Sequence, residues 1–189
     1  MNFLEERILK EATVKKGNVL NVEAFLNHQV DTALMEQMAE EFCRRFAGLP
    51  ITKVLTLETS GIAVAYPVAR LLGVPLVFAR KTKTSRMSDA HMAQVENISN
   101  KKAHVVVSKS VLTAEDRVLI IDDILSAGFT LQALISLVDT AGAAVEGLGI
   151  AIEKGFEEGG WRIRNLGFRL ESLAVIQSMD ESGVIRFQE

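Results

Sequence analysis

The chain has 189 residues, of which 48% are hydrophobic and 24% are charged, and its formal net charge is −3. A chain of this size and composition can bury one core without disulfides or metal, so a single domain over residues 1–189 is predicted. The small acidic excess argues against a nucleic-acid-binding protein, whose surface usually carries a basic excess. The single cysteine, Cys43, cannot form an internal disulfide, and we find no signal-peptide pattern and no apolar run long enough for a membrane span, so we expect a cytoplasmic protein.

The N-terminal quarter of the chain is predicted to contain two helices and one extended segment. Apolar residues recur at helical spacing in residues 3–12 and again in residues 32–46. Asp31 directly precedes the second helix and is a favourable N-cap residue. Between the two helices, residues 19–25 are predicted to be extended.

The first central strand is predicted at residues 53–57 and is followed by Glu58-Thr59-Ser60-Gly61 and a helix over residues 62–72. A small-residue turn that leads into a helix N-terminus can hold an anion with its backbone N–H groups. Because such turns are common, a plain strand-to-helix connection is the commoner interpretation of Thr59-Ser60-Gly61 alone.

A second strand is predicted at residues 76–79, and the sequence then becomes polar up to about residue 100. Residues 80–86 carry four positive charges. Charge runs are usually solvated surface, but a long polar excursion inside a compact α/β domain is also typical of an active-site lid. A strand at residues 103–108 is expected to pair with residues 92–98 as a hairpin.

The most informative stretch begins with the apolar residues Val118 to Ile121, which run directly into Asp122 and Asp123. Ser126-Ala127-Gly128 then lead into an apolar-periodic helix over residues 131–138. This pattern predicts a buried parallel strand, a tight turn and a helix. Ligands of open α/β sheets collect at the carboxyl ends of the strands. The two acids can accept hydrogen bonds from a diol and the turn can hold a phosphate, so the stretch predicts a site for a phosphorylated sugar.

Two other nucleotide-binding interpretations of such a stretch lack their motifs. No G-x-x-x-x-G-K-[ST] sequence occurs, so a P-loop nucleotidase is not supported. The Gly147-Leu148-Gly149 tract continues as an apolar strand without a third glycine, which excludes a dinucleotide-binding fingerprint.

The next strand, predicted at residues 147–152, ends at Glu153-Lys154-Gly155-Phe156. A lysine at this position can donate to the exocyclic oxygen of a 6-oxopurine and an aromatic ring can stack on the base, although a surface charge is the simpler interpretation of Lys154 alone. A short helix and two strands complete the prediction, at residues 161–166, 170–176 and 184–187. The alternation of strands and helices predicts an α/β protein with a parallel sheet of about five strands and helices on both faces.

Several of these segments together resemble the type I purine phosphoribosyltransferases. The stretch VLIIDDILSAG resembles the family's signature for phosphoribosyl pyrophosphate (PRPP). The other matching motifs follow in the family's order: VLNVEAFLNHQVD (19–31), ETSGIA (58–63), VPLVFARKTK (74–83), and IEKGF (152–156) with RLESLAVIQS (169–178). One motif is a modest signal, whereas the whole series in order is a strong one.

The resemblance implies a type I phosphoribosyltransferase fold with three parts. Residues 31–154 would form the core, residues 1–30 and 155–189 a small hood over the base, and residues 81–100 a flexible loop that closes over the donor. It also implies a homodimer, and it leaves open whether Lys81 reaches the site of the neighbouring subunit.

For function, the resemblance implies transfer of the 5-phosphoribosyl group from PRPP to N9 of xanthine, with guanine or hypoxanthine as alternative bases. A non-catalytic PRPP-sensing regulator is a further alternative, but such proteins carry a DNA-binding domain and a basic surface that are not evident in this sequence. The implied site residues, by role, are Asp122, Asp123 and Lys81 for catalysis; Leu20, Asn27, Lys154 and Phe156 for xanthine; Ser126, Ala127, Gly128, Phe129 and Thr130 for the 5-phosphate; and Thr59, Ser60, Gly61 and Lys81 for pyrophosphate.

By residue type alone, Leu20 is best interpreted as a core residue and Asn27 as a turn residue, so their assignment to the base depends on the resemblance. The family's threonine before the glycine is Ala127 here, with Ser126 one place earlier, and we expect backbone contacts to the phosphate to survive this change. Mg²⁺ would be carried by PRPP, and no Cys/His pattern predicts a metal site built by the protein.

Overall fold

The computed structural model describes residues 1–82, 89–96 and 102–188. Its helices are α1 (Phe3–Glu11), the π-helical turn η1 (Glu23–Asn27), α2 (Thr32–Arg45), α3 (Ser60–Leu72), α4 (Phe129–Thr140) and α5 (Gly159–Asn165). Its strands are β1 (Thr13–Lys15), β2 (Val19–Asn21), β3 (Lys53–Leu57), β4 (Leu76–Thr82), β5 (Ala90–Glu96), β6 (Lys102–Ser108), β7 (Arg117–Leu125), β8 (Ala144–Lys154), β9 (Leu170–Met179) and β10 (Ile185–Phe187). None of the helices in these ranges is long and apolar enough to cross a membrane.

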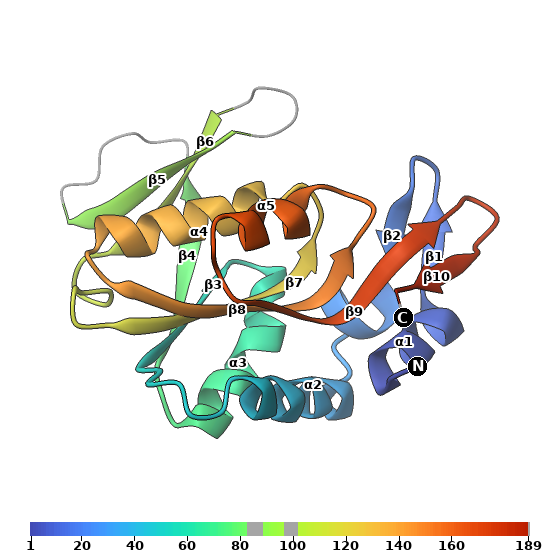
Figure 1. Cartoon of the computed structure of the whole chain (residues 1–189), viewed down its shortest axis with the longest axis horizontal. Coiled ribbons are helices and arrows are strands. Elements are labelled where there is room, and N and C mark those ends of the chain that lie inside the picture. Colours follow the sequence, from blue (N-terminus) through green and yellow to red (C-terminus); the bar gives the residue numbers. More distant parts are fainter. Residues whose placement is uncertain (83–88, 97–101, 189) are drawn as a thin grey trace.

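The main sheet has the strand order β10-β9-β8-β7-β3-β4-β6-β5 (Figure 1). The five strands from β9 to β4 are parallel, which confirms the predicted parallel sheet of about five strands. Antiparallel strands extend both edges, with β10 on β9 and the β6–β5 hairpin on β4. The hairpin itself was predicted, whereas its continuation of the main sheet was not.

Helices cover both faces of the parallel strands and bury a core on each. The core on one face contains residues of α1, α2 and α3, and the core on the other contains residues of α4 and α5. β7 supplies both: Leu119 and Ile121 pack into the first core, and Val118 and Ile120 into the second, all with 0% exposure. Burial on both faces is why this strand is continuously apolar.

The N- and C-terminal segments lie together at the β9–β10 end of the sheet, where α1, the β1–β2 hairpin and β10 are neighbours (Figure 1). Asn2 caps α1 and its Nδ2 donates to Leu173 O of β9 at 2.7 Å. In the β1–β2 turn, Gly17 N donates to Glu181 Oε1 at 2.8 Å. We call α1, the β1–β2 hairpin and β10 the hood. β9, which the expected hood of residues 155–189 included, is a strand of the main sheet.

The segment between the first two long helices differs in type from the prediction. Residues 19–25 were expected to be extended, but β2 ends at Asn21 and the chain turns into η1. Asn21 Oδ1 accepts from Glu23 N at 3.0 Å, which closes a side-chain turn in place of further strand pairing. The turn buries Phe25 and Leu26 completely, at 0% exposure each.

The predicted flexible loop of residues 81–100 is described only in part. β4 continues through Lys81, which pairs with Val105 of β6, and residues 90–96 form β5. Residues 83–88 and 97–100 of the predicted loop lie outside the described residues.

Candidate active site

The predicted site residues meet at one edge of the sheet, where β4, β3, β7 and β8 end. β3 pairs with both β4 and β7, and β7 pairs with β8, so the carboxyl ends of these parallel strands are neighbours. Backbone bonds hold the ends together, since Glu58 N donates to Ala79 O at 3.0 Å. This is the edge at which open α/β sheets bind ligands.

Asp122 and Asp123 lie on β7 at 6% and 8% exposure, and β7 continues beyond them to Leu125. The backbone N–H of Asp123 donates to Asp122 Oδ1 at 3.1 Å. Burial raises the pKa of Asp122 well above its usual value and the nearby Asp123 charge raises it further, while the Lys81 charge acts in the opposite direction. Two neighbouring carboxyl groups can accept hydrogen bonds from both hydroxyls of a vicinal diol.

The Thr59–Gly61 turn lies directly against this acid pair. A Cβ atom on Gly61 would overlap Thr56 Oγ1 and would lie 2.7 Å from Asp122 Oδ1. Only glycine therefore allows α3 to begin so close to β7. The Glu58–Thr59 peptide bond before the helix is cis. The first N–H groups of α3 lack intrahelical partners, so an anion bound there would be next to Asp122.

The turn from Ser126 to Thr130 is the second turn that was predicted to bind an anion. Gly128 has a φ of 85° and is the N-cap residue of α4, a left-handed conformation that favours glycine. Ser126, Ala127, Phe129 and Thr130 are partly exposed. On its inner side the turn contacts Gly159, whose N–H donates to Ser126 O at 3.1 Å. The N-terminus of α4 is thus open to a phosphate.

Lys81 lies on β4 beyond the last residue that pairs with β3, and its side chain is exposed. Its positive charge lowers the pKa of Asp122, so the two side chains of one chain are within electrostatic range. The neighbouring Arg80 lies 3.4 Å from Glu58 Oε2, at the start of the Thr59–Gly61 turn. Lys81 is therefore within electrostatic range of the acid pair, and its role toward pyrophosphate stays a prediction.

Lys154, at the end of β8, faces the hood. Its Nζ lies 3.3 Å from Glu157 Oε1 and donates to Asn18 O, in the β1–β2 turn, at 3.4 Å. Leu20 of the same hairpin is 7% exposed and Phe156 is 43% exposed. Lys154 and the Leu20 hairpin are thus brought together, with an aromatic side chain two residues further along the chain.

Asn27 is placed differently from the other predicted base-binding residues. It ends η1, its side chain is exposed, and η1 packs against α3. Within the described residues no hydrogen bond links Asn27 to Lys154. Its role toward a base stays a prediction.

Sequence reasoning missed three residues at this edge. Thr56 on β3 has 0% exposure, and its Oγ1 has no hydrogen-bond partner among the described residues. Glu153, at 3% exposure, forms a bidentate ion pair with Arg164, and Gly159 contacts the Ser126 turn. A charged residue inside an apolar strand was the available signal for Glu153, whereas Gly159 could be found only from the fold.

The carboxylates at the site are hard oxygen ligands of the kind Mg²⁺ prefers. In the described part of the chain, however, no group of three or more His, Cys, Asp or Glu side chains is arranged to hold a metal ion. The role of Asp122 and Asp123 toward a cation stays a prediction.

The fold is that of the phosphoribosyltransferases. Residues 21–163, most of the chain, match the model of the phosphoribosyl transferase domain, so the chain belongs to this family. Solved structures support the fold: the adenine phosphoribosyltransferase of Rhodothermus marinus has a TM-score of 0.76 at 22% identity, covering 91% of this chain and 97% of that one. The Trypanosoma brucei adenine phosphoribosyltransferase has a TM-score of 0.75 at 20% identity, covering 92% of this chain and 80% of that one.

Curated relatives named xanthine phosphoribosyltransferase are much more similar to this chain in sequence than those two adenine phosphoribosyltransferases are. The protein of Lachnoclostridium phytofermentans is 48% identical over 100% of this chain and 98% of its own length. That of Bifidobacterium adolescentis is 47% identical over 100% of both chains, and that of Bacillus cereus strain AH187 is 44% identical over 100% of this chain and 97% of its own.

Proposed function

We propose that this enzyme transfers the 5-phosphoribosyl group of PRPP to N9 of xanthine, giving xanthosine 5′-monophosphate and pyrophosphate. The observation that carries the proposal is the full-length similarity, at 44–48% identity, to relatives named for this activity. The adenine phosphoribosyltransferases share the fold at lower identity and do not bear on the base.

We assign each group of the site a role in this reaction. Asp122 and Asp123 bind the ribose hydroxyls and orient the anomeric carbon. The Ser126–Thr130 turn binds the 5-phosphate, and the Thr59–Gly61 turn with Lys81 binds pyrophosphate. As the bond from the anomeric carbon to the pyrophosphate oxygen breaks, the electron pair leaves on that oxygen, and N9 attacks the carbon and gives up its proton to solvent water. The enzyme acts mainly by positioning the reactants and by stabilising charge on the leaving group.

We further propose that Asp122 and Asp123 would hold, through water, a Mg²⁺ ion that arrives with PRPP. Such an ion would supply positive charge to the leaving pyrophosphate. The basic side chain of Lys81 would add a second positive charge.

Recognition of the base is assigned to the hood side of the edge. Lys154 donates from its ammonium group to the 6-oxo oxygen, and Phe156 and Leu20 contact the ring. The proximity of Lys154 to the hood hairpin supports this assignment, and Asn27 is proposed to reach the base from η1.

The test is pyrophosphate release by the purified protein with PRPP and Mg²⁺, comparing kcat/KM for xanthine, guanine, hypoxanthine and adenine. Preference for xanthine is the expected result. Preference for guanine or hypoxanthine would agree with the mechanism and reject xanthine as the substrate. Binding of PRPP without release of pyrophosphate with any base would indicate a PRPP-sensing regulator. We also propose a cytoplasmic homodimer, which sedimentation of the pure protein and fractionation of the source cells would test.

A further inference from the structure

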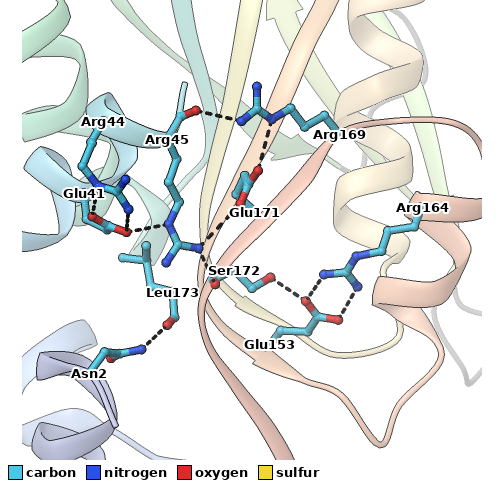
Figure 2. Close-up of polar contacts among 10 residues, drawn as sticks. All are labelled: Asn2, Glu41, Arg44, Arg45, Glu153, Arg164, Arg169, Glu171, Ser172 and Leu173. Atoms are coloured by element: carbon cyan, nitrogen blue, oxygen red, sulfur yellow. Dashed lines mark hydrogen bonds and ion pairs between the residues drawn. The ribbon is translucent and has the colours of Figure 1, made fainter. Parts of the chain in front are cut away.

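The ion pair between Glu153 and Arg164 lies beside the candidate site, and the reaction as described above does not use it. Glu153 ends the buried part of β8 at 3% exposure, and its carboxylate accepts from Arg164 Nη1 and Nη2 at 2.7 and 2.8 Å. The hydroxyl of Ser172 on β9 donates to the same carboxylate, so both oxygens are satisfied (Figure 2). Burial raises the pKa of Glu153, but the bonds from Arg164 and Ser172 outweigh it and keep the pKa below its usual value.

Arg164 belongs to α5, which has only seven residues. A helix this short is not stable alone, so its position depends on its tertiary contacts. Within α5, Ile163 is fully buried, and a Cβ atom on Gly160 would overlap Glu153 Oε1 and would lie 2.6 Å from Arg164 Nη1. The helix backbone therefore rests directly on the ion pair.

The other side of α5 contacts the turn assigned to the 5-phosphate. Gly159 N donates to Ser126 O at 3.1 Å, and a Cβ atom on Gly128 would lie 3.0 Å from Gly159 Cα. Arg162 lies over the ring of Phe129 at 5.6 Å. α5 thus touches the turn at three residues while the ion pair fixes α5 to the sheet.

We propose that Glu153 and Arg164 are positioning residues, which hold α5 against the Ser126–Thr130 turn and so keep that turn in the geometry that binds the 5-phosphate of the donor. This inference rests on the proposed function, because it takes the turn to be the phosphate site. Neither residue needs to touch a substrate, since the effect passes through α5.

The test compares Arg164→Met, which keeps an apolar stem but removes both bonds, with Lys53→Met. Lys53 pairs with Asp116 at 2.9 Å, and these side chains are 15% and 11% exposed. Lys53 begins β3 and Asp116 precedes β7, so this partly buried ion pair lies at the opposite edge of the same sheet. It serves as a matched control for the loss of stability alone.

We expect Arg164→Met to weaken PRPP binding, measured by calorimetry, on the order of tenfold, within the hundredfold that a misplacement of about 1 Å can cost. The KM for xanthine should change less than about twofold, since Lys154, which is proposed to bind the base, is unchanged in this variant. Lys53→Met should lower the unfolding midpoint and leave PRPP binding unchanged. Equal effects of the two variants on PRPP binding, or no effect of Arg164→Met, would overturn the proposal.

A second variant separates positioning from stability. The pair Glu153→Gln with Arg164→Met removes the buried charge that Arg164→Met leaves uncompensated, so the unfolding midpoint should recover while PRPP binding stays weak. Recovery of both together would reduce the ion pair to a structural role and reject the proposal. Binding of PRPP can be measured even if the wild type transfers the phosphoribosyl group to no purine. A wild type that does not bind PRPP would overturn both this proposal and the proposed function.

Discussion

At the scale of single residues, the candidate site depends more on how closely its backbone segments approach the acid pair than on side chains of unusual reactivity. Gly61 is the clearest case, because its missing side chain is what lets the start of α3 reach Asp122. We predict that Gly61→Ala lowers kcat/KM on the order of a hundredfold, since the added methyl group displaces either the turn or the carboxylate by about 1 Å. Steady-state kinetics would measure it.

The control for Gly61→Ala is Gly147→Ala. A Cβ atom on Gly147 would lie 2.6 Å from Phe46 Cε1, in the core and away from the site edge. It should cost stability with little change in kcat/KM. A Gly61→Ala enzyme that keeps wild-type kinetics would contradict the assignment of this turn.

Substitution of Lys154 tests whether the purine base binds at the hood side of the site. A hydrogen bond from a charged donor contributes about 1.5–3 kcal/mol, so Lys154→Met should raise the KM for xanthine roughly ten- to hundredfold and leave PRPP binding unchanged. Lys109→Met, an exposed lysine after β6, is the control and should change neither value. An equal loss for both substrates would indicate a structural role for Lys154.

At the scale of elements, α2 is joined to β9 by a charged network (Figure 2). Arg45 bonds Glu41 Oε1 at 2.7 Å and donates to Ser172 O of β9 at 2.9 Å. The hydrogen bond from Arg44 lowers the pKa of Glu41 to about 2 from 4.5, against the effect of burial and with help from Arg45. Since the folded-state pKa is depressed, the stabilisation is complete above about pH 4.5 and is lost as the pH falls toward 2.

We therefore predict that Glu41→Gln lowers the free energy of unfolding at pH 7 by about 1 kcal/mol, because Arg44 is largely exposed and solvent screens the pair. The difference from wild type should shrink as the pH is lowered from 5 to 3 in urea titrations, because the carboxyl of the unfolded chain, with a pKa of about 4.5, becomes protonated over this range. Glu40→Gln, at an exposed position on the same helix, should show little effect at either pH. A difference that grows on acidification would contradict the prediction.

Sequence patterns could predict some of these helices and strands and not others. β3 was predicted at its observed bounds because apolar runs between turn residues report local burial. η1 was missed because an Asn21 side-chain turn competes with strand pairing, and that outcome is decided by where Phe25 and Leu26 find a core. At the site, the acid pair and both turns could be predicted from contiguous motifs, whereas the ion pair between Glu153 and Arg164 depends on how α5 folds back on β8.

At the scale of the whole molecule, the remaining question is whether one chain supplies the complete site. The resemblance left open whether Lys81 serves its own site or that of a neighbouring subunit. In the structure, the Lys81 charge lowers the pKa of Asp122 of the same chain. We therefore predict that, in the proposed homodimer, Lys81 acts within its own subunit.

Mixing two inactive variants tests this prediction. Lys81→Ala and Asp123→Asn should each lower kcat strongly, and neither should change the dimer measured by sedimentation. If Lys81 acts within its own subunit, each site of a mixed dimer lacks one of the two groups, so unfolding, mixing and refolding the variants together restores no activity. If Lys81 acted across the interface, one site of each mixed dimer would be intact, and random pairing would recover about a quarter of the wild-type activity, by the symmetry of a two-fold dimer. That recovery would refute the prediction and would make the dimer interface part of the active site.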